Sequence, residues 1–172
     1  MTVFYVCYGS NLSEARFRQY LNDYKTPLES YRVNLARDVY YAGGSSRWGG
    51  GIAFLDADRF TAKKVYRAYA LSKPQFESLF SDENGWYRDP LPWDQIHENE
   101  NTYLQSCLYN RIINLGTIHG VPALTFTNED SAEEAARYNW LSEPGPKYTS
   151  VINAGRAETR RLPYRDIVGS TR

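Results

Sequence analysis

The sequence predicts a mixed α+β protein made of one domain, residues 1–172, and three observations lead to this class. Short apolar runs of strand length alternate along the chain with a few segments of helical spacing. A chain of 172 residues suits one domain and can bury a sizeable core. Aromatic residues make up 15% of the chain and include 15 tyrosines, which favours a sheet-rich protein with polar-tipped rings around a cavity or its rim.

The first predicted strand, Val3 to Tyr8, is rich in β-branched and aromatic residues and is expected to be buried on both faces. It stops at Gly9-Ser10-Asn11, and a helix pattern that Ser13 can cap begins directly afterwards. Such a turn exposes consecutive backbone N–H groups beside a helix start, where they can hold a carboxylate or a developing oxyanion. An ordinary structural turn is the alternative interpretation.

Two further strands are predicted in the next stretch. Residues 28–41 alternate loosely, with an interruption near Asn34, and residues 43–46 are predicted as a turn. Residues 56–63 are predicted as a polar turn, and residues 64–71 alternate well enough for a half-buried strand.

The glycine run Gly49-Gly50-Gly51 opens a short strand at residues 52–55. Glycines at this point would let another backbone or a ligand approach closely. A flexible hairpin end is the competing explanation. Trp48 could cover the same opening or pack on the core.

A helix start is clearest at Ser72, which forms a capping-box pattern with Gln75. Gly85 marks the end of this helix. Its apolar stripe consists of Phe76, Leu79 and Phe80. Glu83 continues the stripe, and a carboxylate there is costly unless it has a partner or a chemical role. Desolvation would raise its pKa, as suits a proton shuttle, whereas an ion pair with Arg47 or Arg67 is the structural alternative.

The stretch from residue 86 to residue 104 is predicted as a long irregular loop, of the kind that forms lids or binding loops. Its aromatic residues Trp86, Tyr87 and Trp93 are expected to face a cavity mouth and to determine which compounds are preferred there. His97 is interpreted as an ordinary surface residue, because no catalytic partner is implied nearby.

The last third of the chain is predicted to contain a hairpin and two helices. Residues 103–115 and 121–127 are apolar β-rich runs joined by a turn at 116–120. Residues 130–140 have helical spacing, and another helix begins at Lys147. The apolar face of that final helix consists of Tyr148, Val151, Ile152 and Gly155.

The composition of the chain disfavours some classes of binding partner. The 20 basic and 20 acidic residues give a formal charge of zero, which disfavours a nucleic-acid or membrane-surface partner. Cys7 and Cys107 have no metal-ligand spacing and are interpreted as free thiols in a reducing compartment. No signal-like or membrane-length apolar segment is found, so we expect a cytoplasmic protein. Because no cluster of residues has metal-ligand spacing, we expect no metal and no other cofactor.

Four segments of the chain stand out together. They are Tyr8-Gly9-Ser10-Asn11-Leu12; Trp48-Gly49-Gly50-Gly51-Ile52-Ala53; Leu79 with Glu83; and Pro144-Gly145-Pro146-Lys147-Tyr148 with Val151-Ile152, Gly155 and Leu162-Pro163-Tyr164. In this order they resemble the motifs of the gamma-glutamylcyclotransferase-like family, over nearly the whole chain. Two positions depart from the family pattern: Cys7 stands where the family usually has alanine, and Asn84 separates Glu83 from the following glycine.

The resemblance implies a small mixed β-barrel flanked by helices, with the glycine turn and the glutamate facing one cavity. It also implies cyclotransferase chemistry of the acyltransferase or lyase type, as in glutathione metabolism. The α-amine of a γ-glutamyl group attacks its own γ-carbonyl, which forms 5-oxoproline and releases an amine or amino acid. This intramolecular aminolysis needs a folded substrate, a base and an oxyanion site, but no enzymic nucleophile and no cofactor.

By the same resemblance Glu83 is the expected general acid/base, and the Tyr148 hydroxyl could hydrogen-bond to Glu83 or the substrate. The expected substrate-binding residues are Tyr8, Gly9, Ser10, Asn11, Leu12, Gly50, Gly51 and Tyr148. The expected partner is a small γ-glutamyl compound. Because fold does not determine function, a non-catalytic small-molecule-binding module that has kept the cavity is the alternative, and another amide-processing reaction is a third.

Overall fold

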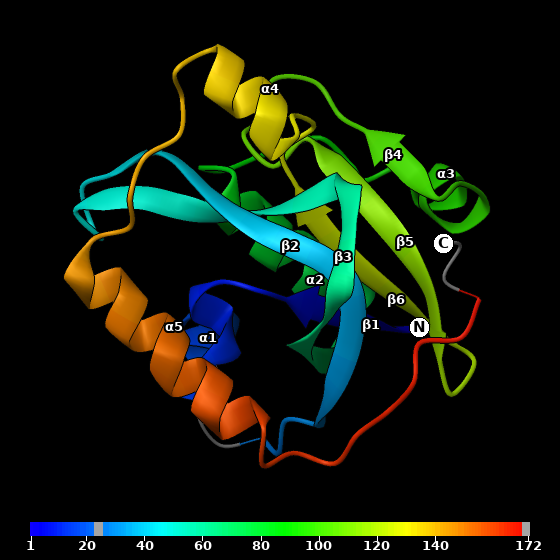
Figure 1. The fold of residues 1–172 in the computed structure, drawn as a ribbon. Helices are drawn as coiled ribbons and strands as arrows, with labels where there is room; N and C mark the ends of the chain where they lie inside the picture. Colours follow the sequence, from blue (N-terminus) through cyan, green and yellow to red (C-terminus); the bar gives the residue numbers. More distant parts are fainter. Residues whose placement is uncertain (23–25, 170–172) are drawn as a thin grey trace.

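The computed structural model describes residues 1–22 and 26–169, which form a six-stranded mixed sheet with helices packed around it (Figure 1). In chain order the strands are β1 (Thr2–Cys7), β2 (Ser30–Ser45), β3 (Gly50–Ser72), β4 (Asn101–Tyr103), β5 (Arg111–Ile118) and β6 (Val121–Thr127). The helices are the 3-10 turn η1 (Ser10–Leu12), α1 (Glu14–Leu21), α2 (Lys73–Glu83), α3 (Trp93–Glu98), α4 (Ala132–Arg137) and α5 (Pro146–Thr159). This arrangement confirms the α+β class.

Strand β1 lies in the middle of the sheet, whose order is β2-β3-β1-β6-β5-β4. It pairs antiparallel with β3 and parallel with β6. Every residue from Val3 to Cys7 is buried, as the continuous apolar run predicts for a strand covered on both faces. The end of β1 therefore delivers the following glycine turn into the interior of the protein.

The sheet is curled, but it is not closed into the barrel that the family resemblance implied (Figure 1). Its two edges are β2 and β4. The chain near Tyr164 and Leu141 covers the outer edge of β2, through isolated bridges to Arg32 and Ala42. Strand β4 is only three residues long and offers few groups for pairing. Because one edge is already covered and the other is very short, neither needs the pairing that closure would provide.

Two segments that were predicted as irregular contain regular elements in the structure. Residues 56–63 are not a turn, because β3 runs unbroken through them and pairs with β2. Many side chains in this part of the ribbon are exposed, so the sequence carries no alternation of apolar and polar residues there. The expected loop at 86–104 contains α3 and β4, which are short elements with weak sequence signals.

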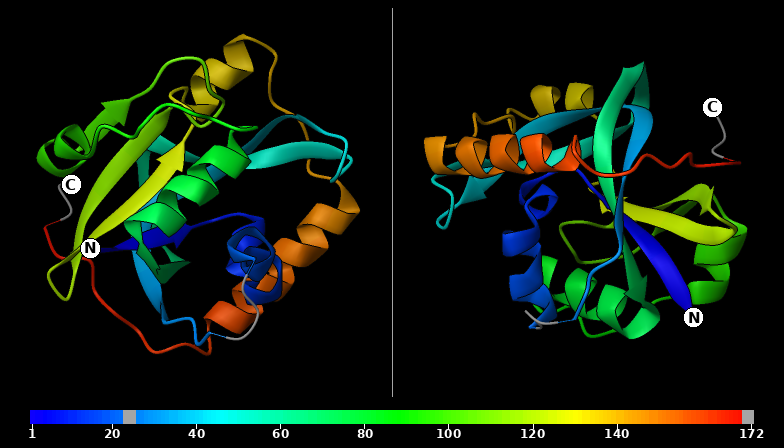
Figure 2. Two further views of the ribbon diagram at one scale, coloured as in Figure 1. Left: turned by 180° about the vertical axis from the view of Figure 1, so that it is seen from behind. Right: turned by 90° about the horizontal axis from the view of Figure 1, so that it is seen from below.

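The predicted start of α2 is confirmed. The Ser72 hydroxyl accepts a hydrogen bond from the Gln75 backbone N–H, and the Gln75 side chain accepts one from the Ser72 N–H. Gly85 follows the helix with a φ of +66°, a left-handed conformation suited to glycine. The buried residues of the helix are Phe76, Leu79 and Phe80. Seen from behind, α2 lies across one face of the sheet (Figure 2), and it contacts β1. Its last residue, Glu83, accepts a hydrogen bond from the Asn11 side chain just beyond the end of β1.

Two more helices surround that same end of β1. Helix α1 contacts α2, and η1 contacts both α1 and α5. Ser13 caps α1 by accepting a hydrogen bond from the Arg16 N–H, as the sequence predicts. Within the described ranges, no helix has the length and apolarity needed to cross a membrane.

Candidate active site

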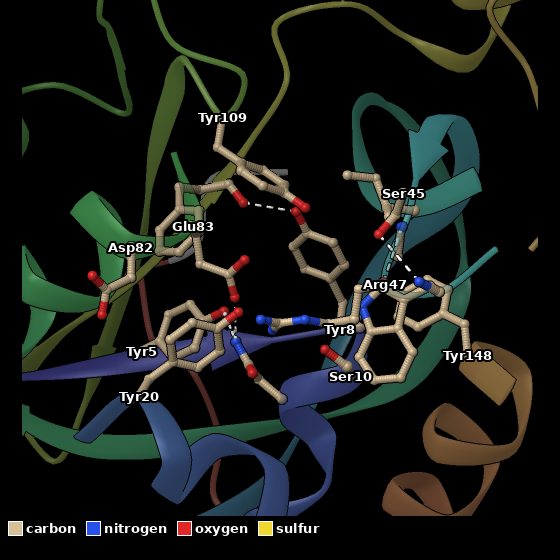
Figure 3. A pocket seen from close by; sticks show the side chains of 16 residues that line it. Tyr5, Tyr8, Ser10, Tyr20, Ser45, Arg47, Asp82, Glu83, Tyr109 and Tyr148 are labelled. Atoms are coloured by element: carbon tan, nitrogen blue, oxygen red, sulfur yellow. Dashed lines mark hydrogen bonds between the residues drawn. The ribbon is translucent and has the colours of Figure 1, made fainter. Parts of the chain in front are cut away.

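A cavity of about 250 Å³ lies at the end of β1, where β1, η1, α1, α2 and α5 meet the start of β3 (Figure 3). The residues that line it are Tyr5, Tyr8, Gly9, Ser10, Asn11, Tyr20, Ser45, Arg47, Trp48, Ile52, Ala53, Asp82, Glu83, Tyr109, Phe126 and Tyr148. These side chains come from segments far apart in the sequence. The fold therefore assembles a cavity whose wall is rich in tyrosine hydroxyls and contains two carboxylates.

The glycine turn forms one wall of the cavity. The Leu12 N–H donates to the Gly9 carbonyl at 3.1 Å, so the chain begins a 3-10 turn immediately after the strand. Within the described part of the chain, no acceptor is recorded for the N–H groups of Gly9, Ser10 and Asn11. Such groups at the start of a helical turn can receive a carboxylate or an oxyanion.

Helix α5 packs directly on this turn. A Cβ added at Gly155 would lie 2.6 Å from the Leu12 carbonyl carbon, so a larger residue there would push α5 away. A Cβ at Gly9 would lie 3.0 Å from the Tyr148 hydroxyl oxygen. The two glycines allow the helix and the turn to approach until the Tyr148 hydroxyl reaches the cavity wall.

Arg67 holds the turn from the side opposite the cavity. It is fully buried on β3 and donates to the Leu12 carbonyl at 3.1 Å. It also forms ion pairs with Glu158 and, at 2.7 Å, with Glu14. The Tyr69 hydroxyl donates to the Asn11 carbonyl at 2.9 Å. These bonds occupy the carbonyls of the turn and fix its position relative to α1 and α5.

Glu83 is the last residue of α2, and its half-buried side chain faces the turn across the cavity. The Asn11 side-chain amide donates to its carboxylate at 2.9 Å. Burial raises the pKa of Glu83, while the hydrogen bonds from Asn11 and Tyr20 and the charges of Arg16 and Arg47 act against that rise.

The structural alternative for Glu83 predicted an ion pair with Arg47 or Arg67. Arg67 is engaged with other carboxylates, and among the described residues no cation lies within 4.0 Å of the Glu83 carboxylate oxygens. Glu83 is thus a carboxyl group held by an amide, with a raised pKa and access to a cavity. A raised pKa in a carboxyl group that faces a cavity is typical of functional sites.

The tyrosines around Glu83 are neutral hydrogen-bonding groups. Burial raises the pKa of Tyr8 and Tyr148 well above that of free tyrosine. The Tyr8 hydroxyl donates to the Phe126 carbonyl at 2.8 Å. The Tyr148 hydroxyl oxygen accepts the Ala53 N–H at 3.1 Å, and no acceptor for its own proton is recorded among the described residues. Tyr148 does not contact Glu83 through a recorded hydrogen bond, so its hydroxyl can donate to a bound molecule.

Six of the expected catalytic and binding residues line this one cavity: Tyr8, Gly9, Ser10, Asn11, Glu83 and Tyr148. Leu12 does not line it and is buried behind the turn, against Gly155. Gly50 and Gly51 are also absent from the cavity wall. A Cβ on Gly51 would lie 2.1 Å from the Ser142 carbonyl oxygen. Of the two explanations for this glycine run, close approach of another backbone is the one observed.

The aromatic residues of the expected lid do not line the cavity. Trp86 is exposed, and Tyr87 packs edge-on against Phe80. The Trp93 indole N–H donates to Glu77 at 2.5 Å, and its ring stacks on His97. The interpretation of this stretch as the cavity rim is wrong. Helix α3 contacts β4 and β5, and the Tyr87 and Trp93 rings pack on side chains of α2 outside the cavity wall.

Sequence reasoning did not place Tyr5, Tyr20, Ser45 and Tyr109 at the site, although all four line the cavity. Burial raises the pKa of Tyr20 to about 12. The sequence could have indicated the position of Tyr20, because this residue lies on the apolar face of α1 next to the turn. Among the described residues, no group of three or more His, Cys, Asp or Glu side chains is arranged to hold a metal ion.

No known family model matches the sequence. No curated protein matches it significantly. Solved structures do match its fold. A structure titled gamma-glutamyl cyclotransferase aligns with a TM-score of 0.55 and 14% identity, over 100% of this chain and 94% of the other. An uncharacterized protein from Homo sapiens aligns with a TM-score of 0.54 and 15% identity, over 99% and 94% of the two chains.

Proposed function

Because the chain has the gamma-glutamyl cyclotransferase-like fold, we propose that it converts a γ-glutamyl amide or peptide to 5-oxoproline and a free amine or amino acid. One observation carries the proposal. The Glu83 carboxyl group, with its raised pKa, faces the N–H groups of the glycine turn across a small cavity. A base and an anion-binding turn are the two elements that an intramolecular aminolysis requires.

In the proposed reaction the turn and the tyrosines hold the glutamyl group folded, so that its α-amine lies next to its γ-carbonyl. Glu83 accepts a proton from the α-ammonium group. The amine then forms the ring C–N bond, and negative charge develops on the carbonyl oxygen. The N–H groups of residues 9–11 are available to stabilise that oxygen or the substrate carboxylate.

Collapse of the tetrahedral intermediate breaks the original amide bond. Glu83 gives its proton to the departing nitrogen, and it then takes the second proton of the original ammonium group from the ring nitrogen. The released amine accepts that proton and becomes an ammonium ion, so Glu83 ends the cycle ionised, as it began. A raised pKa supports both halves of this role, because it brings the proton affinity of the carboxyl group closer to that of the nitrogens with which it exchanges a proton. The Tyr148 hydroxyl proton is available to the carbonyl oxygen or the glutamyl carboxylate.

The proposal is tested by incubating the purified protein with γ-glutamyl dipeptides, γ-glutamyl amines and glutathione, and measuring 5-oxoproline. We expect catalytic release from at least one class of substrate. If none is turned over but γ-glutamyl compounds still bind with defined stoichiometry in calorimetry, the protein is the binding module and not the enzyme.

A further inference from the structure

Arg47 is the one cationic side chain in the cavity wall among the described residues. It lies in the short connection between β2 and β3, and it is exposed at the boundary between cavity and solvent. Figure 3 shows its guanidinium extended across the cavity on the same side as the Glu83 carboxylate. No ion pair or hydrogen bond is recorded for it with any described residue. A guanidinium pointing into a cavity without a protein partner is suited to bind an anionic group of a ligand.

The neighbouring cations are placed differently. The Arg16 guanidinium donates to the Tyr20 hydroxyl at 3.0 Å and lies 4.6 Å from the Tyr20 ring centre, so it is already engaged. The Lys147 amine lies 5.7 Å from the Trp48 ring and does not line the cavity. Arg47 is therefore the group that a bound anion would meet first.

A γ-glutamyl amino acid carries two carboxylates. One belongs to the glutamyl group, and the N–H groups of the glycine turn can receive it together with the reacting part of the molecule. The other belongs to the leaving amino acid and must point toward the mouth, because the product departs that way. At about 250 Å³ the cavity is smaller than ordinary ligand pockets of 300–1,000 Å³. The leaving group is consequently small, and its carboxylate stays within reach of Arg47.

We propose that Arg47 is a specificity-determining residue that binds the carboxylate of the leaving group. The preferred substrates are then small γ-glutamyl amino acids, and γ-glutamyl amines without that carboxylate are poor substrates. This inference rests on the proposed function. It adds to it the chemical class of the leaving group and the residue that recognises it.

The test uses γ-glutamyl-alanine and γ-glutamyl-ethylamine, which differ only by the leaving-group carboxylate. We expect the wild type to favour the alanine compound in kcat/KM by about 10- to 100-fold, the range for one charge-assisted hydrogen-bonded contact. In Arg47→Gln the ratio of the two kcat/KM values should fall by most of that factor. Loss of the Arg47 charge near Glu83 acts on both compounds alike and leaves this ratio unchanged. Arg47→Lys should keep part of the preference, because a point charge replaces the bidentate fork. Lys147→Gln, which removes an equal charge near the mouth, should keep the full preference.

An equal fall on both substrates in Arg47→Gln would overturn the inference, because Arg47 would then act on the glutamyl group or on Glu83. A wild type with less than about threefold preference would also overturn it, whatever the variants do. Absence of 5-oxoproline from both compounds would instead contradict the proposed function itself, and the inference would fall with it. The thermal unfolding midpoint of each variant is measured as well, so that the kinetic comparison is made only between folded proteins.

Discussion

Replacing Arg67 by methionine should unfold the protein more easily, because this residue ties the glycine turn to two helices. The side chain is fully buried, and its ion-pair partners Glu14 and Glu158 are 32% and 42% exposed. Removing one partner of a buried pair typically costs about 3–5 kcal/mol. We expect a value near the lower end, about 3 kcal/mol, because water reaches both carboxylates and compensates part of the loss. The unpaired Leu12 carbonyl adds to this cost.

The assay is urea unfolding at 25 °C, compared with Arg137→Met as a matched control. Arg137 also forms an ion pair, with Glu133 on α4, but the two side chains are 68% and 76% exposed. Its removal should cost about 0.5 kcal/mol or less. A loss of free energy of unfolding below about 1 kcal/mol in Arg67→Met, or one equal to that of the control, would refute the role given to Arg67.

Two further predictions concern packing and pH. Gly51→Ala should destabilise the protein by about 1–3 kcal/mol in urea unfolding, because the added Cβ would collide with the Ser142 carbonyl oxygen. Gly44→Ala is the control and should be nearly neutral, because a Cβ at Gly44 meets no atom within 4 Å. The folded pKa of Glu83 is raised, so the unfolded chain loses that proton first as the pH rises. The free energy of unfolding of the wild type should therefore fall relative to that of Glu83→Gln as the pH rises from about 4.5 through the folded pKa. Equal slopes of the free energy of unfolding against pH in the two proteins would contradict a raised pKa at Glu83.

Local signals predicted the parts of the fold that depend on short-range chemistry. The capping box at Ser72, the strand from Val3 and the turn at Gly9 all follow from residues a few positions apart. The path of β3 through residues 56–63 could not be predicted in this way. Its pairing partners lie on β2, and the exposed ribbon has no apolar alternation to reveal them.

The candidate site was only partly accessible from the sequence for the same reason. Glu83 stood out because a carboxylate on a buried helix face is costly. Tyr109 and Ser45 gave no such sign, since their place in the cavity depends on sheet order and on the curl of the sheet. Trp93 was expected at the rim because of its type, but α3 turns it toward Glu77 and away from the cavity.

The most direct test of the account is the rate of 5-oxoproline release by Glu83→Gln. This change keeps the shape of the side chain and removes the base, so turnover should fall by about 100-fold or more, while the variant is no less stable than the wild type at neutral pH and ligand affinity changes little. Glu98→Gln is the matched control, because Glu98 is also the last residue of a helix but is exposed and away from the cavity. If the glutamine variant at position 83 releases 5-oxoproline at the wild-type rate, Glu83 is not the proton shuttle.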